Sequence, residues 1–434
     1  MGGIDLPDDK QATLMLPIRP CATPKVLKVP LSPTLKVVAN AIVDVGQRVN
    51  AGQKIAQAKD GFGIYAPLAG KVSAICNVFV ATSRGPALTP AIELSELSDW
   101  TLPDLQSKPT SLAIADFENA TDELLREKII DSGIFVHRGH SERLSDWLER
   151  AKRKQVKLLL ANAMEDQPYV SADHRLLAEQ GPSVVMGLAI LARAIGVKES
   201  MLAADQRHTD HYRRLIETCR KYKISTVALP HKYPIGADAV LVKVLTRKER
   251  PIGGCTMDVG TAVIDVATCF AVYRWVTLGR RADGRVVTVG GDNAESIGNF
   301  WVPFGMPCGD LQKTGQTLIH GGPMVGQRCM DDSVVTPATD ALITVESQVP
   351  VATPCIRCSW CTDHCPARLN VAVLNDAYEL GMVAKAQKMG ALSCMDCGVC
   401  SYLCPARLPL SQRVKQLKAS IGLNACSTGR QVQP

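Results

Sequence analysis

Short runs that alternate apolar and polar residues, separated by glycines, dominate the N-terminal part of the chain. Between Lys25 and Ile75, segments such as KVLKVPL, IVDVG and IYAPLAG show this two-residue period. A period of two is typical of β-strands, because successive side chains point to opposite faces of a sheet. The glycines between the segments supply turns. The pattern therefore predicts an all-β domain over residues 1–105.

Two segments of this domain, VDVGQRVNAGQKIA and IYAPLAGKVSAI, are similar to the paired halves of the barrel-sandwich hybrid found in biotinyl and lipoyl domains. Those domains carry their cofactor on a Met-Lys dipeptide in the turn. No such dipeptide stands in the turn here. We therefore expect a barrel-sandwich hybrid without a covalently attached cofactor.

From about Ser111 the pattern changes to buried apolar runs that alternate with helical segments. The predicted strands are residues 156–163, 199–205 and 225–230, and the predicted helices are residues 181–197 and 210–223. Strands that alternate with helices indicate a doubly wound α/β layer with a parallel sheet. We assign this layer to residues 106–252.

Two further domains and a tail follow. Residues 253–346 contain the strand-and-glycine segments RVVTVGGD and LIHGGPMVG, which predict a small β-rich, β-grasp-like domain. Residues 347–422 hold two cysteine-rich motifs and a helical segment between them. The end of the chain, residues 423–434, is polar and is predicted to be disordered.

A polar loop directly follows the first predicted strand of the α/β layer. It reads ANAMEDQPYVSADHR and carries the carboxylates of Glu165, Asp166 and Asp173. Ligands of α/β sheets bind at the carboxyl ends of the strands, so this loop is a candidate binding site. The same residues could equally form an ordinary surface loop with a helix cap, and the pattern alone leaves both interpretations open.

The strongest chemical signal is a cysteine motif that occurs twice, PCIRCSWCTDHCPARL and SCMDCGVCSYLCPARL. Both copies have the spacing C-x2-C-x2-C-x3-C-P of bacterial two-cluster ferredoxins. Zinc sites usually have separated C-x2-4-C pairs, and disulfides need an oxidising compartment. The spacing thus predicts two 4Fe–4S clusters that relay electrons.

In this motif the fourth cysteine lies too far along the chain to close its own cluster and crosses to the other one. The first cluster is therefore assigned to Cys355, Cys358, Cys361 and Cys404. The second is assigned to Cys394, Cys397, Cys400 and Cys365. The eight cysteines outside the motifs show no pairing pattern, and we assign them no chemistry.

Composition and the distribution of apolar residues argue against several classes of protein. A net charge of +7 with 5% aromatic residues lacks the basic and stacking surface that nucleic-acid binders use, so we expect no nucleic-acid partner. The first residues, MGGIDLPDDK, do not resemble a signal peptide. The longest apolar run, from Ser183 to Val197, contains Arg193 and is too short to span a bilayer. These features predict a cytoplasmic multidomain protein.

Taken in order, these segments resemble the C subunit of the Rnf complex, the ion-translocating NADH:ferredoxin oxidoreductase of bacteria. The resemblance covers nearly the whole chain. The family's opening Gly-Gly-Ile-x-x-Pro phrase and its Asn-x-x-Glu-x-x-Pro-Tyr phrase are both present, as are KYPIGAD, NFWVPFGMP, GGPMVG and both cysteine motifs. The matching residues of the two phrases are Gly2, Gly3, Ile4 and Pro7, then Asn162, Glu165, Pro168 and Tyr169.

The resemblance implies a function for each domain. In the family the α/β layer is shared with the flavin subunit of complex I, binds FMN, oxidises NADH and passes electrons to the two clusters. It implies that Asn162, Glu165, Asp166 and Tyr169 lie at the flavin and nicotinamide site. It also implies a peripheral subunit on the cytoplasmic face of the inner membrane, which works with the other Rnf subunits and with ferredoxin or a similar carrier.

Two departures from the family pattern concern the flavin. The family has a loop of the type Gly-Leu-Gly-Gly-Ala-Gly-Phe-Pro-Thr, whose backbone amides approach phosphate. The corresponding stretch here, SGIFVHRGHSERLSDW, places His137, Arg138 and His140 where the family has small residues. Asp265 also stands where the family has Asn. Either FMN binds with different partners, Arg138 or the histidines, or the site binds none.

Three hypotheses follow from the sequence. The first is a translocase subunit that takes electrons from NADH through FMN. The second is an iron–sulfur relay or adaptor subunit that has lost NADH and FMN binding. The third is a soluble flavo-iron–sulfur reductase such as a cobalamin reductase. The third family carries its barrel-sandwich unit at the other end, so the domain order here argues against it.

Overall fold

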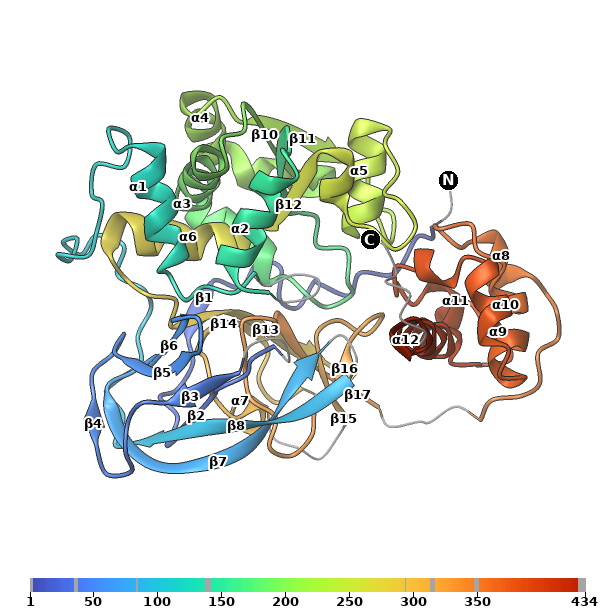
Figure 1. The fold of residues 1–434 in the computed structure, drawn as a ribbon, viewed down its shortest axis with the longest axis horizontal. Helices are drawn as coiled ribbons and strands as arrows, with labels where there is room; N and C mark the ends of the chain where they lie inside the picture. The colour runs from blue at the N-terminus through green and yellow to red at the C-terminus, as the bar shows by residue number, and fades with distance from the viewer. Residues whose placement is uncertain are drawn as a thin grey trace.

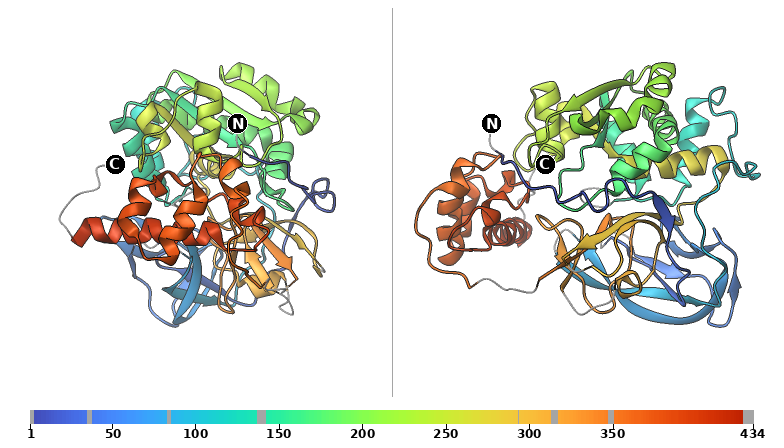
Figure 2. Two further views of the ribbon diagram at one scale, coloured as in Figure 1. Left: turned by 90° about the vertical axis from the view of Figure 1, so that its right-hand side faces the viewer. Right: turned by 180° about the vertical axis from the view of Figure 1, so that it is seen from behind.

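The computed structural model describes residues 3–34, 38–82, 85–136, 142–292, 294–312, 317–346 and 351–427 of the 434-residue chain. Figure 1 shows an α/β layer above two β-rich units, with a separate helical unit at one end. The views in Figure 2 show the N-terminal segment running between the α/β layer and the β-rich units. This architecture confirms the fold class predicted from the sequence.

The N-terminal β unit is a sandwich of two small antiparallel sheets. One sheet has the order β2-β8-β7-β4 and the other the order β3-β5-β6. The strands are β2 (Leu27–Pro30), β3 (Ala39–Ala41), β4 (Arg48–Val49), β5 (Lys54–Ala58), β6 (Gly63–Tyr65), β7 (Gly70–Thr82) and β8 (Gly85–Ser95). The turns fall at the glycines that punctuate the sequence, such as Gly46 and Gly52, both with positive φ.

The α/β layer is a four-stranded parallel sheet of order β11-β10-β9-β12. Its strands are β9 (Leu158–Ala163), β10 (Glu199–Asp205), β11 (Ser225–Leu229) and β12 (Thr261–Asp265). Helices cover both faces, as its near-continuous apolar strands require. They are α1 (Asp122–Ile130), α2 (Leu144–Arg153), α3 (Ala172–Ile195), η1 (Gln206–Tyr212), α4 (Arg213–Lys221), α5 (Asp238–Thr246), η2 (Thr256–Val259) and α6 (Val266–Leu278).

Helices α3 and α6 pack closely on one face of this sheet. Gly187 of α3 allows the approach, because a Cβ there would lie 1.8 Å from the carbonyl oxygen of Cys269. Helix α3 begins nine residues before the predicted helix and bends at Gln180, where the backbone leaves helical geometry just before Pro182. The sequence pattern thus predicted only the apolar part of this helix that follows the bend.

The second β-rich unit is a six-stranded sheet of order β1-β14-β13-β17-β15-β16. Its elements are β1 (Ile18–Pro20), β13 (Gly284–Gly291), β14 (Gly298–Pro303), α7 (Cys308–Leu311), β15 (Thr317–His320), β16 (Gln327–Arg328) and β17 (Ala341–Val345). Strand β1 runs parallel to β14 at one edge. Strand β1, inside the predicted 1–105 domain, therefore pairs outside the two barrel-sandwich sheets.

The predicted boundary at residue 253 is also wrong, because β12 and α6 belong to the α/β layer. Strand β12 pairs with β9, and α6 packs against α3. No turn signal separates β12 from α6 in the sequence, since Asp265 both ends the strand and caps the helix by accepting a hydrogen bond from the Thr268 amide. The α/β layer therefore continues to Leu278.

The C-terminal unit is helical and has its own small core, centred on residues such as Leu374 and Leu417. Its elements are α8 (Trp360–Asp363), α9 (Val371–Glu379), α10 (Val383–Lys388), η3 (Ala391–Ser393), α11 (Val399–Tyr402) and α12 (Leu410–Ser427). Helix α12 continues through Ser427, so the prediction of disorder is wrong for residues 423–427. Residues 428–434 lie outside the described residues.

Within the described ranges, every helix is too short or too polar to cross a membrane.

Candidate redox centre

Two cavities in the C-terminal unit are each lined by four motif cysteines. The first cavity combines the three leading cysteines of the first motif with the last cysteine of the second, namely Cys355, Cys358, Cys361 and Cys404. The second has the reverse combination, Cys394, Cys397, Cys400 and Cys365. We call these cavities cage 1 and cage 2. The grouping is the crossed one that the sequence predicts.

The two cages are built by the same backbone turns. Arg357 and Asp396 follow their first cysteines by two residues and have φ of 57° in both cases. Ser359 and Gly398 follow the same first cysteines by four residues and have φ of 65° and 79°. These left-handed residues curl the chain around the cavity. The amide of Asp396 donates to Sγ of Cys394 at 3.4 Å, the kind of bond that tunes a cluster potential.

Three thiols of cage 2, those of Cys394, Cys397 and Cys400, have a raised pKa and are hard to ionise by themselves. Burial raises the pKa of Cys394 to about 12 and that of Cys397 to about 11. Thiolates in such a place need a bound cation, because a coordinating metal deprotonates its thiol ligands outright. The ammonium of Lys418, which donates to the carboxylate of Asp396 at 2.7 Å, adds positive charge nearby. Four converging, half-buried thiols therefore fit a 4Fe–4S cluster.

The polar residues predicted for the flavin site gather where strand β9 ends. The side chain of Asn162 is fully buried and donates to the carbonyl of Gly236 at 2.9 Å and to the carboxylate of Asp238 at 3.1 Å. The carboxylate of Asp166 accepts a hydrogen bond from the Gly236 amide at 2.7 Å. These two side chains thus hold the loop after β9 against the loop after β11.

Glu165 caps helix α3. Its two carboxylate oxygens accept hydrogen bonds from the amides of Asp173 and His174 at 2.9 and 3.2 Å. This arrangement is the helix-cap interpretation that the sequence left open, since a carboxylate satisfies the exposed amides of a helix N-terminus. Lys10 of the N-terminal segment is buried here, and its ammonium donates to the carbonyl of Glu165.

Tyr169 points towards the second β-rich unit. Its hydroxyl lies 3.4 Å from the carboxylate of Asp292, and the residue packs against the small apolar cluster of Val170, Ala341 and Ile343. The sequence placed it with Asn162, Glu165 and Asp166, whereas the structure brings only these three to the end of β9. The departure at Asp265 has a structural explanation, because this buried carboxylate caps α6.

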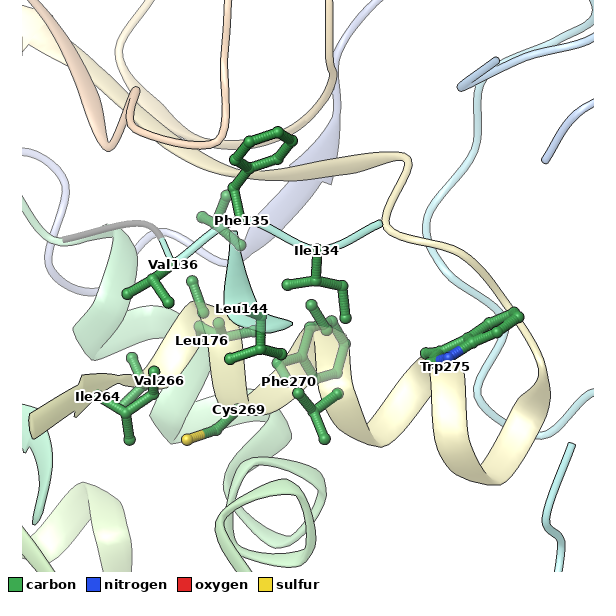
Figure 3. Packing of buried hydrophobic residues seen from close by; sticks show 14 of the residues in the cluster. Ile134, Phe135, Val136, Leu144, Leu176, Ile264, Val266, Cys269, Phe270 and Trp275 are labelled. Carbon is green, nitrogen blue, oxygen red and sulfur yellow. The ribbon is translucent and has the colours of Figure 1, made fainter. Parts of the chain in front are cut away.

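The stretch that corresponds to the family's glycine-rich loop is packed with apolar side chains. Figure 3 shows Ile134 and Val136 near Leu144 and Phe270, with the ring of Phe135 on the opposite side of this chain segment. That ring packs edge-on against Phe62 of the barrel-sandwich unit, with centroids 5.2 Å apart. The described part of this stretch thus carries large buried side chains.

The amides of this stretch are used within the protein. Val136 donates to the carbonyl of Glu142 at 2.9 Å, and Leu144 donates to the carbonyl of Ile134 at 2.8 Å. These positions therefore offer no backbone amide to a phosphate. Residues 137–141, with the departures at His137, Arg138 and His140, lie outside the described residues.

A chain of contacts joins the end of β9 to cage 2. The hydroxyl of Tyr233 donates to the carbonyl of Cys397 at 2.5 Å and accepts from the side-chain amide of Gln167 at 3.0 Å. The side chain of Gln167 in turn accepts from the amide of Met324 at 3.3 Å. A Cβ on Gly398 would lie 2.2 Å from the Met324 carbonyl oxygen, so cage 2 sits directly against the body of the protein.

Comparison with known families gives three matches along the chain. Residues 1–95 match the RnfC barrel sandwich hybrid domain, residues 144–274 the Nuo51 FMN-binding domain, and residues 349–405 a 4Fe-4S dicluster domain. The C subunit of the ion-translocating oxidoreductase complex of Rhodobacter capsulatus is 30% identical over 405 residues, which cover 90% of this chain and 76% of that protein. The chain belongs to the family of these C subunits.

Other members of the family differ in length from this chain. The C subunit of the proton-translocating ferredoxin:NAD(+) oxidoreductase complex of Clostridium ljungdahlii is 29% identical, with 86% of this chain and 83% of that protein covered. The C subunit of the ion-translocating oxidoreductase complex of Edwardsiella ictaluri is 30% identical, and the match covers 85% of this chain but 47% of that protein.

Among solved structures, an NAD+-reducing [NiFe]-hydrogenase in the air-oxidized state is similar at a TM-score of 0.49 and 18% identity, covering 69% of this chain and 63% of that chain.

Family membership identifies the chain as an electron-transfer subunit of an oxidoreductase complex. The matched FMN-binding and 4Fe-4S dicluster domains support FMN and two 4Fe–4S clusters as its cofactors.

Sequence reasoning missed two groups of residues. Tyr233 and Gln167, which link the α/β layer to cage 2, carry no spacing signal because they come from separate loops. Cys308, His320 and Cys329 also come together, with their ligand atoms all within 4.8 Å of one another. Their spacing in the sequence matches no common metal motif, and only the pairing of the strands shows that they are neighbours.

Proposed function

We propose that this chain is the peripheral electron-input subunit of an Rnf-type ion-translocating complex. It takes electrons from NADH through FMN in the α/β layer and passes them through two 4Fe–4S clusters to a partner. The observation that carries this proposal is the hydrogen bond from Tyr233 to the carbonyl of Cys397. It places the end of the parallel sheet, where α/β proteins bind ligands, directly beside cage 2.

This contact indicates the direction in which electrons pass through the two clusters. Electrons enter the cluster in cage 2, which lies against the α/β layer and β15–β16. They leave from cage 1, where Cys358 is exposed and two large apolar side chains, Ile356 and Trp360, are 66% and 53% exposed. Apolar side chains around an exposed cluster ligand suit a transient electron-transfer partner. The partner is another subunit of the complex or a ferredoxin-type carrier.

The side chains at this site hold its loops in position and do not themselves take part in the electron transfer. Asn162, Glu165 and Asp166 hold the loops at the carboxyl edge in place, and Lys10 adds a buried positive charge beside them. FMN supplies the step from two-electron to one-electron transfer. The clusters are held by the crossed sets of cysteines in cages 1 and 2.

A second candidate function is favoured by one observation. The amides of Val136 and Leu144 are occupied within the protein, and Phe135 is buried against Phe62. A relay subunit that receives electrons from a partner protein, without flavin or NADH, is consistent with this packing. The clusters and the exit at cage 1 are the same in both cases.

We propose that the chain is bound to the cytoplasmic face of the cell membrane by other subunits. The relatives named above belong to ion- or proton-translocating complexes. In the native host, the chain should sediment with membranes and be released from them by high salt or chaotropes. Recovery entirely in the soluble fraction would contradict membrane docking.

The deciding experiment reconstitutes the full chain anaerobically with iron, sulfide and FMN. Flavin content is then measured together with NADH-dependent reduction of a dye. Stoichiometric FMN with rapid NADH oxidation supports the electron-input role and excludes the relay alternative. Clusters that dithionite reduces but NADH does not, in a chain without flavin, would establish the relay role instead.

A further inference from the structure

Two cysteines and a histidine meet in the second β-rich unit, far along the chain from the cluster motifs. Cys308 is the first residue of α7, His320 is the last residue of β15, and Cys329 directly follows β16. Sγ of Cys308 lies 3.3 Å from Nε2 of His320, and all three ligand atoms lie within 4.8 Å of one another. The three side chains therefore converge on one point.

The ring of His320 is oriented for metal binding. Its other nitrogen, Nδ1, lies 3.2 Å from the hydroxyl of Thr339, which itself accepts a hydrogen bond from the amide of Thr336. In the tautomer that carries its proton on Nδ1, this nitrogen donates to the hydroxyl of Thr339. The other nitrogen, Nε2, then has a free lone pair, which points towards the two sulfur atoms. Metal-bound histidines are usually held in this way by a partner on the second nitrogen.

The surroundings suit a soft divalent cation. Cys308 and His320 are 2% and 6% exposed, and Thr339 is fully buried. A tetrahedral zinc ion with bonds of about 2.3 Å to sulfur and about 2.0 Å to nitrogen separates these ligand atoms by about 3.5 to 3.8 Å. The observed spacing needs only a small adjustment to reach this geometry.

We propose that the chain binds one zinc ion through Cys308, His320 and Cys329. Three protein ligands leave a fourth position for water, and binding releases the protons of the two thiols to solvent. This site is separate from the eight cysteines of the cages and from the electron path.

The zinc ion would tie α7 to both strands of the β15–β16 hairpin. The turn of this hairpin carries Met324, which packs against Gly398 of cage 2 and donates its amide to Gln167. Zinc therefore stabilises the surface on which the cluster domain rests. Its loss should loosen the hairpin while leaving the cluster ligands unchanged.

The test uses the full chain with its clusters assembled under anaerobic conditions, so that the cages hold iron. Elemental analysis should find about one zinc per chain in addition to the cluster iron. Single substitutions Cys308→Ser, Cys329→Ser and His320→Gln should each lower the zinc content at least tenfold. The matched control, Cys76→Ser, changes a half-buried cysteine of β7 and should keep both zinc and iron.

X-ray absorption at the zinc edge of the unsubstituted chain tests the site without relying on the folding of any variant. The expected first shell has two sulfur atoms and one nitrogen, with one further light atom. A four-sulfur shell would place the zinc in a cage and overturn the proposal. Zinc below about one tenth per chain, or a Cys308–Cys329 disulfide found by non-reducing peptide mapping of the anaerobic protein, would also overturn it.

Discussion

The hydroxyl of Tyr233 lies 2.5 Å from the backbone carbonyl of Cys397 and donates a hydrogen bond to it. Tyr233 is 1% exposed, and burial raises the pKa of its phenol, so that it stays protonated at physiological pH. The bond joins the loop after β11 to a cysteine of cage 2. It is therefore a direct structural link between the two domains.

Tyr233→Phe should weaken this link without removing a cluster ligand. The substitution removes the hydrogen bond to Cys397 and the one from Gln167, each worth about 0.5–1.5 kcal/mol, so the cluster domain should unfold at a lower temperature with its iron retained. Calorimetry of the anaerobic protein measures the shift, and Tyr402→Phe, at a 54% exposed tyrosine, serves as the control. Equal melting temperatures for both variants would mean that the Tyr233 bond carries no stability.

Gly398→Ala should disturb the contact between cage 2 and the hairpin. The new Cβ would lie 2.2 Å from the carbonyl oxygen of Met324, at a φ of 79°. Hydrogen exchange should therefore rise in residues 321–326 and 394–400.

Gly381→Ala is the matched control for that substitution. Gly381 has a similar φ of 62°, but no atom of a distant residue lies within 4 Å of the point that its Cβ would occupy. It should show only the cost of a left-handed alanine, about 1–2 kcal/mol. If both variants exchange alike, backbone strain alone explains the effect and the close contact is unimportant.

The crossed assignment of the cysteines makes a prediction for each cage. Cys404→Ser should expose Cys355, Cys358 and Cys361 to alkylation while the cysteines of cage 2 stay protected, because the missing ligand belongs to cage 1. Cys365→Ser should give the opposite pattern. Peptide mapping after alkylation reads out both, and protection of the wrong cage would refute the crossing.

The sequence predicted the structural features that depend on the spacing of residues close together in the chain. Both cages were assigned from the cysteine motifs, because the turns that build a cage lie within a few residues of its ligands. The carboxylates of Glu165, Asp166 and Asp173 were also predicted in the loop after the first strand of the layer, since a parallel sheet directs its ligand site to the carboxyl ends of its strands, and the family resemblance added Asn162.

Features that depend on contacts between distant segments were not predictable in this way. Strand β1 joins a sheet whose other strands begin 264 residues later, at Gly284, counted from Pro20. The zinc ligands become neighbours only when β15 and β16 pair. The side chain of Glu165 was expected at a ligand, but the unsatisfied amides of α3 compete for the same carboxylate.

The central claim is that this chain carries electrons through two 4Fe–4S clusters. Iron and sulfide analysis, combined with electron paramagnetic resonance during a reductive titration of the full anaerobic chain, tests it most directly. The account predicts about eight irons per chain and two magnetically interacting cluster signals. About four irons with a single signal, or zinc in place of iron in the cages, would contradict it.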